Sequence, residues 1–279
     1  MQLSIKVHNQ LLDLSLPRVM AIANITPDSF YTSWGNISEE DILNNVQLLL
    51  NQGADIIDIG ACSTRPNSTP VDAKEEWQRL VPILQTIRAH FPDAIISVDT
   101  FRADIAEKAI ALGADIINDV YGGDADENIW KIVAKHQVPY VLTFTQQIPT
   151  TSADKYDQTM SFMLQWFQSR LDTLHRMGVA DVIIDPGFGF NKTEQQNYTI
   201  LSQMQLLEIL NAPILVGISR KSMLYNPLGS TPSDVLPATI AANTLALERK
   251  AHILRVHDVE AAKQAITVYS LIKKITTCS

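Results

Sequence analysis

The chain repeats one unit about eight times: a short run of apolar residues, a polar loop, and a longer segment with apolar residues every three to four positions. Continuous apolar runs between turn residues indicate strands buried on both faces, and the longer segments indicate amphipathic helices. The expected strands are 19–23, 55–59, 95–99, 116–119, 139–143, 182–185, 213–217 and 253–256. The expected helices are 39–52, 72–90, 102–112, 127–135, 157–177, 193–210, 236–249 and 259–275. This alternation predicts an α/β fold closed as a (β/α)8 TIM barrel.

No Gly-, Pro- or Ser-rich linker interrupts the alternation, so residues 1–279 are expected to form a single domain. Apolar residues alternate with polar ones on both sides of a polar turn within residues 1–17, which predicts an N-terminal β-hairpin outside the main sheet. An open, doubly wound sheet is the alternative architecture. It is less favoured because no G-x-G-x-x-G motif follows the first strand.

The composition restricts the partners and the compartment. A net charge of −8 and a pI near 5.2 argue against nucleic acid as a partner, because binding to it requires many Lys and Arg residues. No apolar stretch is long enough to span a membrane, and the first residues lack the pattern of a signal peptide. Cys62 and Cys278 show neither disulfide nor metal spacing. These features predict a soluble cytoplasmic protein.

Acidic and amide side chains stand at the ends of three expected strands: Asp99, Asn118 and Asp185. Active sites of TIM barrels lie at the C-terminal ends of the strands, so these side chains are candidate site residues. Carboxylates can accept paired hydrogen bonds from an N–H edge such as that of a 2-amino-4-oxopyrimidine. A strand-end Asp can instead cap a helix or pair with a neighbouring Arg, and that alternative stays open for Asp99.

Cationic side chains follow the seventh and eighth strands. Lys221 lies in Ser219-Arg220-Lys221, while Arg255 and His257 are two positions apart on one strand and therefore on one face. The loops after these strands often bind phosphate in TIM barrels, and Arg65 after the second strand could reach the same anion. Solvated surface charges are the alternative reading of these cations.

The expected pocket therefore holds a small polar heterocycle that carries a phosphate or pyrophosphate group. Asn24, after the first strand, could contribute one ligand to Mg²⁺, which keeps several waters and takes substrate phosphate oxygens. No Ser-His-Asp, Cys-His or HExxH arrangement is apparent, so the site is suited to the departure of a leaving group rather than to a covalent enzyme intermediate.

Seven motifs occur in order at successive strand ends and together resemble the motif set of the dihydropteroate synthase family. They are Asn24-Ile-Thr-Pro-Asp-Ser-Phe30, Ser63-Thr-Arg-Pro66, Ser97-Val-Asp-Thr100, Ile117-Asn-Asp-Val120, Asp185-Pro-Gly-Phe-Gly-Phe190, Gly217-Ile-Ser-Arg-Lys-Ser222 and Arg255-Val-His-Asp-Val259. The resemblance runs from about Val19 to the C-terminus and implies a pterin-binding TIM-barrel enzyme. Such an enzyme joins 6-hydroxymethyl-7,8-dihydropterin pyrophosphate to p-aminobenzoate by a dissociative substitution, is a sulfonamide target, uses Mg²⁺ and forms homodimers.

The resemblance also implies a role for each matching residue. The pterin would be held by Asp99, Asn118, Asp185 and Lys221, and the pyrophosphate by Arg65, Arg255 and His257. The p-aminobenzoate would lie near Thr64, Pro66, Lys221 and Ser222, and Asn24 would bind Mg²⁺. The chemistry itself would depend on Lys221, Asp99, Arg255 and His257.

The chain departs from the family pattern after Phe30, where Tyr31 to Gly35 lacks the usual acidic residue. Two alternatives therefore stay open: a non-catalytic pterin-binding paralogue, and a pterin-dependent methyltransferase. Arg65, Lys221, Arg255 and His257 favour the synthase over the paralogue, because a simple pterin binder does not need to bind pyrophosphate. The Ser63-Thr-Arg-Pro66 and Ser219-Arg-Lys221 motifs favour it over the methyltransferase, which lacks both.

Overall fold

The computed structural model describes residues 3–8, 10–23, 38–61, 71–149 and 157–277. Within these ranges eight parallel strands form one sheet in the order β8-β7-β6-β5-β4-β3-β10-β9. Their bounds are β3 (Arg18–Ala23), β4 (Ile56–Gly60), β5 (Ile96–Asp99), β6 (Ile116–Asp119), β7 (Tyr140–Thr143), β8 (Val182–Asp185), β9 (Leu215–Val216) and β10 (Ile253–Val256).

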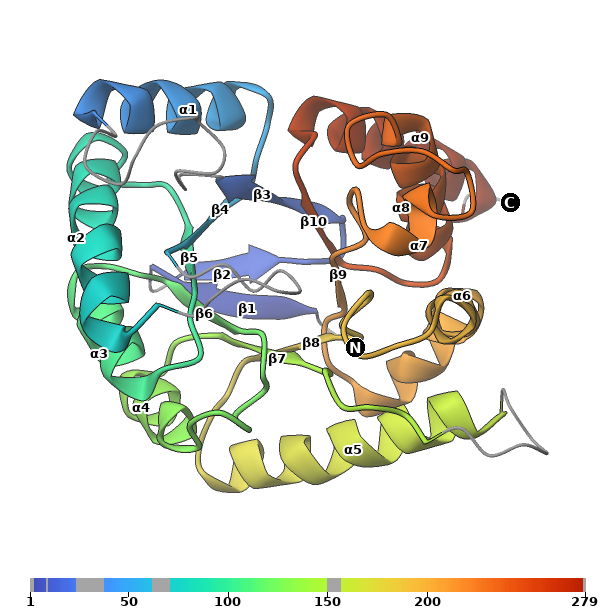
Figure 1. Cartoon of the computed structure of the whole chain (residues 1–279), viewed down its shortest axis with the longest axis horizontal. Helices are drawn as coiled ribbons and strands as arrows, with labels where there is room; N and C mark the ends of the chain where they lie inside the picture. Colours follow the sequence, from blue (N-terminus) through green and yellow to red (C-terminus); the bar gives the residue numbers. More distant parts are fainter. Residues whose placement is uncertain (1–2, 9, 24–37, 62–70, 150–156, 278–279) are drawn as a thin grey trace.

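The two strands at the ends of this order, β8 and β9, meet. A parallel bridge joins Ile184 to Ile214, and Ile184 N donates to Pro213 O at 2.9 Å. The sheet is therefore closed into a barrel, as Figure 1 shows along the ring from β3 through β10. The predicted barrel is confirmed, and the open doubly wound sheet is excluded.

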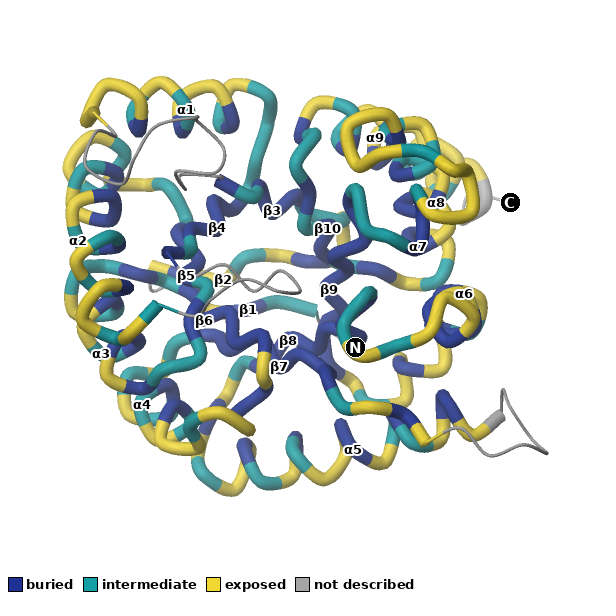
Figure 2. The backbone as a smooth tube through the Cα atoms, in the orientation of Figure 1, coloured by how far each residue is buried: buried dark blue, intermediate teal, exposed yellow. Residues whose placement is uncertain are grey.

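The helices surround the strands, with their inner sides buried and their outer sides exposed (Figure 2). Their bounds are α1 (Glu39–Asn51), α2 (Ala73–His90), α3 (Ala103–Ala111), α4 (Asn128–His136), α5 (Asp157–Arg176), α6 (Glu194–Gln203), α7 (Ser222–Tyr225), α8 (Leu236–Glu248) and α9 (Val259–Thr277). Ser38 and Asp41 form a capping box at the start of α1, which fixes that helix start. None of the helices in the described ranges is long and apolar enough to cross a membrane.

Two expected elements are shorter than the sequence pattern indicates. The prediction of one helix over 193–210 is wrong beyond Gln203, where the chain continues as the 3₁₀ helix η1 (Met204–Leu210). Met204 and Leu207 are both buried, and a repeat of three residues per turn keeps both on one face. The expected strand 213–217 has ladder pairing only at Leu215 and Val216.

The N-terminal hairpin closes one end of the barrel. Strands β1 (Ser4–Val7) and β2 (Gln10–Asp13) form a separate antiparallel sheet, as predicted. Ile5, Val7 and Leu14 are buried against the inward-facing apolar residues at the N-terminal ends of the barrel strands. Those strand residues are Met20, Ile56, Ile116, Val141, Ile183, Leu215 and Ile253. This end of the barrel is thus filled with apolar side chains, and polar side chains are left to the other end.

Replacement of Leu14 by alanine should lower the free energy of unfolding by about 2–5 kcal/mol, because a buried side chain is truncated against a packed core. Leu11→Ala is the matched control: Leu11 is 66% exposed, so its truncation should change stability by less than about 0.5 kcal/mol. Urea unfolding followed by circular dichroism measures both. Equal losses in the two variants would show that the hairpin does not pack as described.

Candidate active site

A polar layer lies above the apolar end of the barrel because side chains alternate along each strand. Two residues after each inward-facing isoleucine comes a polar side chain that faces the same interior. The pairs are Ile56 and Asp58, Ile116 and Asn118, Ile183 and Asp185, and Ile253 and Arg255. The polar residues therefore meet at the C-terminal ends of the strands, where TIM-barrel sites form.

The first cluster in this layer is built around Arg255. Its Nε lies 2.7 Å from Asp58 Oδ2, and its Nη2 lies 2.9 Å from Asp99 Oδ2. Asn118 Nδ2 lies 3.3 Å from both carboxylate oxygens of Asp58. Burial raises the pKa of Asp99 to about 7, while the Arg255 charge acts in the opposite direction. The alternative considered for Asp99, a pair with a neighbouring Arg, is therefore observed in addition to its place at the barrel mouth.

Asp58 is part of this cluster, although as a polar residue at a strand end it received no role among the predicted site residues. The repeated phrase Gly-Ala-Asp-Ile-Ile was the available signal, since Asp58 and Asn118 follow its two copies at equivalent positions. Both copies begin with a glycine at positive φ, +96° at Gly53 and +97° at Gly113. The two copies thus place an acid and an amide on neighbouring interior positions, where they bond to each other.

The second cluster pairs Asp185 with Lys221. Gly187 N donates to Asp185 Oδ1 at 2.7 Å, and burial raises the pKa of Asp185 while the Lys221 charge lowers it. Burial lowers the pKa of Lys221 to about 8, with Asp185 opposing that change. Lys221 Nζ also donates to Phe188 O and lies 4.5 Å from the centroid of the Phe190 ring. The charges of Asp185 and Lys221 thus stabilise each other, with Asp185 buried, Lys221 half-buried and an aromatic ring beside the lysine.

His257 and Ser222 follow the last residues of β10 and β9, respectively, in the described structure. His257 Nδ1 lies 3.0 Å from Ser219 Oγ, and His257 N donates to the same oxygen at 3.3 Å. Ser222 opens the short helix α7 directly after Lys221. Arg220 differs from its neighbours, because its guanidinium bonds to Asp258 at 2.6 and 2.9 Å and is an ion-pair partner there. The cationic group expected after β9 is therefore reduced to Lys221.

Asp119 also stands at a strand end but faces the opposite side of the sheet from Asn118. It accepts hydrogen bonds from Tyr140 Oη at 2.7 Å and from the main-chain N–H groups of Tyr121 and Gly123 at 2.9 and 2.8 Å. Burial raises the pKa of Asp119 to about 6. Asp119 therefore fixes the loop after β6 and does not belong to the polar layer inside the barrel.

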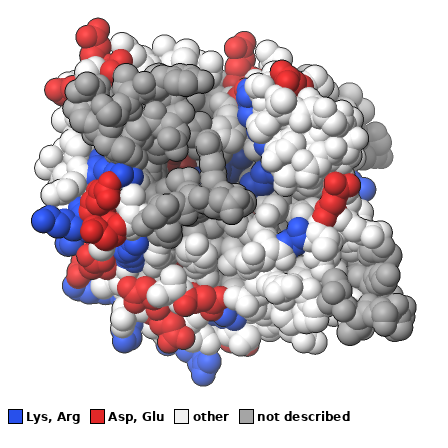
Figure 3. All heavy atoms as spheres, in the orientation of Figure 1, with Lys and Arg blue, Asp and Glu red and all other residues white. Residues whose placement is uncertain are grey.

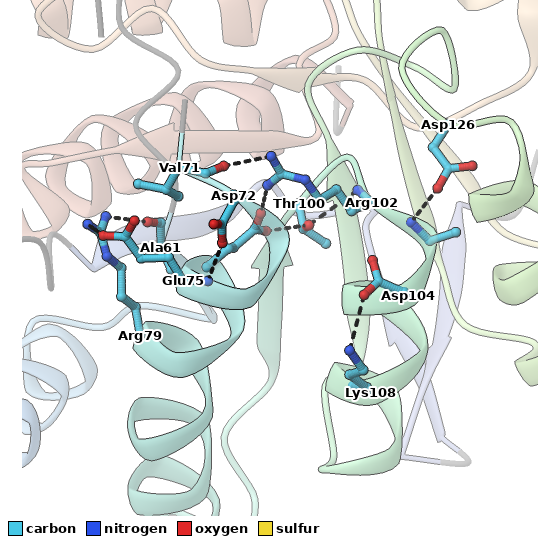
Figure 4. Close-up of polar contacts among 12 residues, drawn as sticks. Ala61, Val71, Asp72, Glu75, Arg79, Thr100, Arg102, Asp104, Lys108 and Asp126 are labelled. Carbon is cyan, nitrogen blue, oxygen red and sulfur yellow. Dashed lines mark hydrogen bonds and ion pairs between the residues drawn. The ribbon is translucent and has the colours of Figure 1, made fainter. Parts of the chain in front are cut away.

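A buried ion pair supports the strand end that carries Asp99. Thr100 Oγ1 donates to Glu76 Oε1 at 2.6 Å, and the Arg102 guanidinium bonds to the other oxygen of Glu76. Arg102 also reaches Val71 O at 2.7 Å; Figure 4 shows Thr100, Arg102 and Val71 converging from the ends of α2 and β5. The buried Glu76 thus anchors the residues that follow Asp99 to helix α2.

Four predicted site residues, Asn24, Thr64, Arg65 and Pro66, lie outside the described residues. Within the described ranges, no three His, Cys, Asp or Glu residues gather as a metal cluster. The described carboxylates of the polar layer are engaged by Arg255 and Lys221. This donor set fits a Mg²⁺ ion that takes most of its ligands from water and substrate phosphates.

The chain matches a known family over most of its length. The sequence profile of the family described as pterin binding enzyme matches residues 20–257. Dihydropteroate synthase of Escherichia coli K12 is 37% identical over 261 residues, which cover 92% of each chain. Dihydropteroate synthase of Synechocystis is 38% identical, over 90% of this chain and 88% of that protein.

Solved structures give the same result. Dihydropteroate synthase of Xanthomonas albilineans with 4-aminobenzoic acid has a TM-score of 0.87 at 33% identity, covering 98% of this chain and 99% of that one. The Xanthomonas enzyme in complex with 7,8-dihydropteroate has a TM-score of 0.84 at 32% identity, with 97% and 98% covered. The Yersinia pestis enzyme with a sulfonamide drug has a TM-score of 0.87 at 33% identity, with 98% and 100% covered. The chain belongs to the family of pterin-binding enzymes and, within it, to the dihydropteroate synthases, which are transferases of folate synthesis.

Proposed function

We propose that the chain joins 6-hydroxymethyl-7,8-dihydropterin pyrophosphate to p-aminobenzoate, with release of pyrophosphate. The observation that carries this proposal is the polar layer, which lies above the apolar end of the barrel. In it two cations, Arg255 and Lys221, meet three acids, which are Asp58, Asp99 and Asp185. Relatives in complex with 4-aminobenzoic acid and with 7,8-dihydropteroate support the same pair of substrates. We assign the pterin to Asp99, Asn118, Asp185 and Lys221, since the carboxylate and amide groups of the first three match its N–H edge.

We assign the pyrophosphate to Arg65, Arg255 and His257. In the proposed dissociative mechanism the C–O bond to pyrophosphate breaks first, and its electron pair leaves with the pyrophosphate. The amine nitrogen of p-aminobenzoate then attacks the methylene carbon and loses a proton. Arg255 and His257 favour the first step because negative charge develops on the leaving group beside them. The p-aminobenzoate is assigned to Thr64, Pro66, Lys221 and Ser222.

Magnesium is proposed as the cofactor, with Asn24 as its protein ligand. When bound, the ion would neutralise charge on the pyrophosphate. The residues of this chain would orient the pyrophosphate through Arg255 and His257 and hold the pterin against Lys221.

Pyrophosphate release tests the proposal directly. Purified protein is given the pterin pyrophosphate and Mg²⁺, with and without p-aminobenzoate, and pyrophosphate and 7,8-dihydropteroate are measured. Release that rises with p-aminobenzoate and yields dihydropteroate supports the synthase. Tight binding of the pterin pyrophosphate without such release points instead to a non-catalytic paralogue.

Anion binding at Arg255 should strengthen as the pH falls through about 7. Burial raises the pKa of Asp99 to about 7, so above this pH Asp99 is ionised and holds Arg255 Nη2, whereas below it Asp99 is protonated. Nη2 then becomes available to an anion, while Asp58 still holds Arg255 Nε. Sulfate affinity measured by calorimetry between about pH 6 and pH 8 should show this dependence in the wild type. Asp99→Asn should remove it, and an identical pH dependence in the two proteins would contradict the competition.

We further propose that the chain acts as one domain over residues 1–279, located in the cytoplasm, with small-molecule substrates and no nucleic-acid partner. The net charge of −8 supports small substrates rather than nucleic acid. On the face drawn in Figure 3, Lys and Arg along α2, α3 and α4 are interspersed with Asp and Glu, so no continuous basic area is seen there.

A homodimer is proposed from an apolar stripe on α9. Val268 and Leu271 are 60% and 57% exposed and lie three positions apart on one face of the helix. Leu16, which is 53% exposed, lines one shallow groove with Leu271. An exposed apolar area of this kind is typical of a protein interface, and sedimentation equilibrium measures the oligomeric state.

A further inference from the structure

The side chain of Lys192, in the loop after β8, ends among main-chain carbonyl groups. Its Nζ donates to Phe144 O at 2.8 Å, Gly187 O at 2.7 Å and Phe190 O at 3.1 Å. It also lies 4.8 Å from the centroid of the Phe144 ring. An ammonium group has three N–H donors, so three carbonyl oxygens satisfy all of them. Carbonyl oxygens and an aromatic face around one positive charge are the surroundings in which proteins bind monovalent cations.

The three carbonyl groups belong to two barrel loops that approach each other closely. Phe144 follows β7, whereas Gly187 and Phe190 lie in the loop after β8. Gly187 has a φ of +65°, and a Cβ atom there would lie 2.1 Å from Phe144 O. Carbonyl oxygens that converge on one point repel each other, and the repulsion is strong in a low-dielectric interior. Burial lowers the pKa of Lys192 to about 7, with the Asp185 charge opposing that change, and the protonated ammonium group offsets the repulsion and so stabilises the close approach of the two loops.

The loop after β8 also surrounds Asp185 and Lys221. Gly187 N donates to Asp185 Oδ1 at 2.7 Å. Phe188 O accepts a hydrogen bond from Lys221 Nζ, and the Phe190 ring centroid lies 4.5 Å from the same atom. Any displacement of this loop therefore changes the surroundings of both charged groups.

We infer that Lys192 is a positioning residue whose ammonium group acts as a built-in monovalent cation, holding the loops after β7 and β8 so that Asp185 and Lys221 face the pterin site. The inference rests on the proposed function of that site. Lys192 acts through the main chain, since its three donors are used by the carbonyl groups. The ammonium group offsets the repulsion between the carbonyl oxygens, as a bound potassium ion would, and does not depend on the ions in solution.

The inference is tested by truncating the Lys192 side chain and adding a small amine to the solution in its place. Lys192→Ala removes Cγ, Cδ, Cε and Nζ, and n-propylammonium supplies the same atoms. We expect this variant to lose roughly tenfold in kcat/KM for the pterin pyrophosphate and to regain a substantial part in n-propylammonium. Propanol, which has the same carbon chain without the charge, should not restore activity.

Two further variants separate the charge from the volume of the side chain. Lys192→Met fills the space of the stem but carries no charge, so it should be impaired and should not respond to n-propylammonium. Lys131→Ala removes an exposed lysine from α4, where Lys131 Nζ donates to Asn128 Oδ1 at 2.9 Å, and should keep wild-type rates.

Binding of 6-hydroxymethylpterin, followed by its fluorescence, is measured on the same samples. If the wild type binds the pterin but shows no turnover, the proposed function is wrong. The Lys192 inference is then still tested by whether Lys192→Ala loses pterin binding and regains it in n-propylammonium. Wild-type affinity and rate in Lys192→Met overturn the inference, as does a folded Lys192→Ala that gains nothing from the amine. If Lys192→Ala does not fold, Lys192→Gln replaces it, and full activity of that uncharged variant also overturns the inference.

Discussion

Arg255→Ala should lower the rate constant for consumption of the pterin pyrophosphate by about a hundredfold, which corresponds to about 2.7 kcal/mol of transition-state stabilisation. Arg255 is the residue that joins the two acids of the first cluster, and we assign it to the developing charge on the pyrophosphate. Its removal takes away that positive charge and leaves Asp58 and Asp99 facing each other. Without Arg255 the pKa of Asp99 rises further, and the negative charge that remains on the two acids disfavours an anionic leaving group in the same place. Single-turnover measurement of pyrophosphate release gives the rate constant.

A matched control removes another arginine from an ion pair at the closed end of the barrel. Arg88 bonds to Asp115 at 2.8 Å and to the carbonyl groups of Ala94 and Gly113, far from the polar layer in the barrel architecture. Arg88→Ala should therefore lower stability but keep the rate per folded molecule. An unchanged rate in Arg255→Ala would refute the assignment of this residue to the pyrophosphate.

Lys221→Met should lower kcat/KM by about a hundredfold, as for Arg255→Ala, and it should also destabilise the fold. Asp185 is buried, and Lys221 is the strongest of the charges that lower its pKa, so loss of Lys221 leaves the carboxylate less stabilised and lowers the free energy of unfolding. The pterin also loses the cationic group proposed to contact it. Urea unfolding measures the first effect, and steady-state kinetics with the pterin pyrophosphate measures the second.

The double variant Asp185→Asn/Lys221→Met distinguishes these two effects. It removes the carboxylate charge, so stability should recover in part, while activity should stay about a hundredfold below the wild type. Recovery of activity together with stability would mean that the pair is needed only for folding.

The architecture could be predicted from the sequence because the strand and helix periods differ and repeat along the chain. Most strand bounds agree within one residue, since buried strands between turn residues have clear ends. The break at Gln203 was not predictable, because no Gly or Pro marks it and only packing of Met204 and Leu207 favours the tighter helix. The alternation along β10 placed Arg255 inside the barrel, where it bonds to Asp58 and Asp99, whereas His257 lies beyond the last residue of that strand.

Contacts between distant positions were the part that the sequence could not supply. Arg255 and Asp58 are 197 residues apart, and nothing local indicates that they pair. Arg220 and Lys221 are adjacent and both cationic, yet Arg220 bonds to Asp258 while Lys221 stands beside Asp185. Asn118 and Asp119 likewise face opposite sides of one strand. Residue type indicated a polar site, and only the closed barrel decides which of the polar residues share it.

The hairpin at the closed end has a practical consequence for anyone who produces part of this chain. The family profile begins at residue 20, and a fragment cut at that point would keep all the assigned site residues. It would also lose Ile5, Val7 and Leu14 and expose the inward-facing isoleucines of the barrel floor to solvent. Such a fragment should precipitate during expression or purification, because an exposed apolar surface of this kind promotes aggregation. The shortest soluble form of the enzyme is therefore longer than the segment that defines its family.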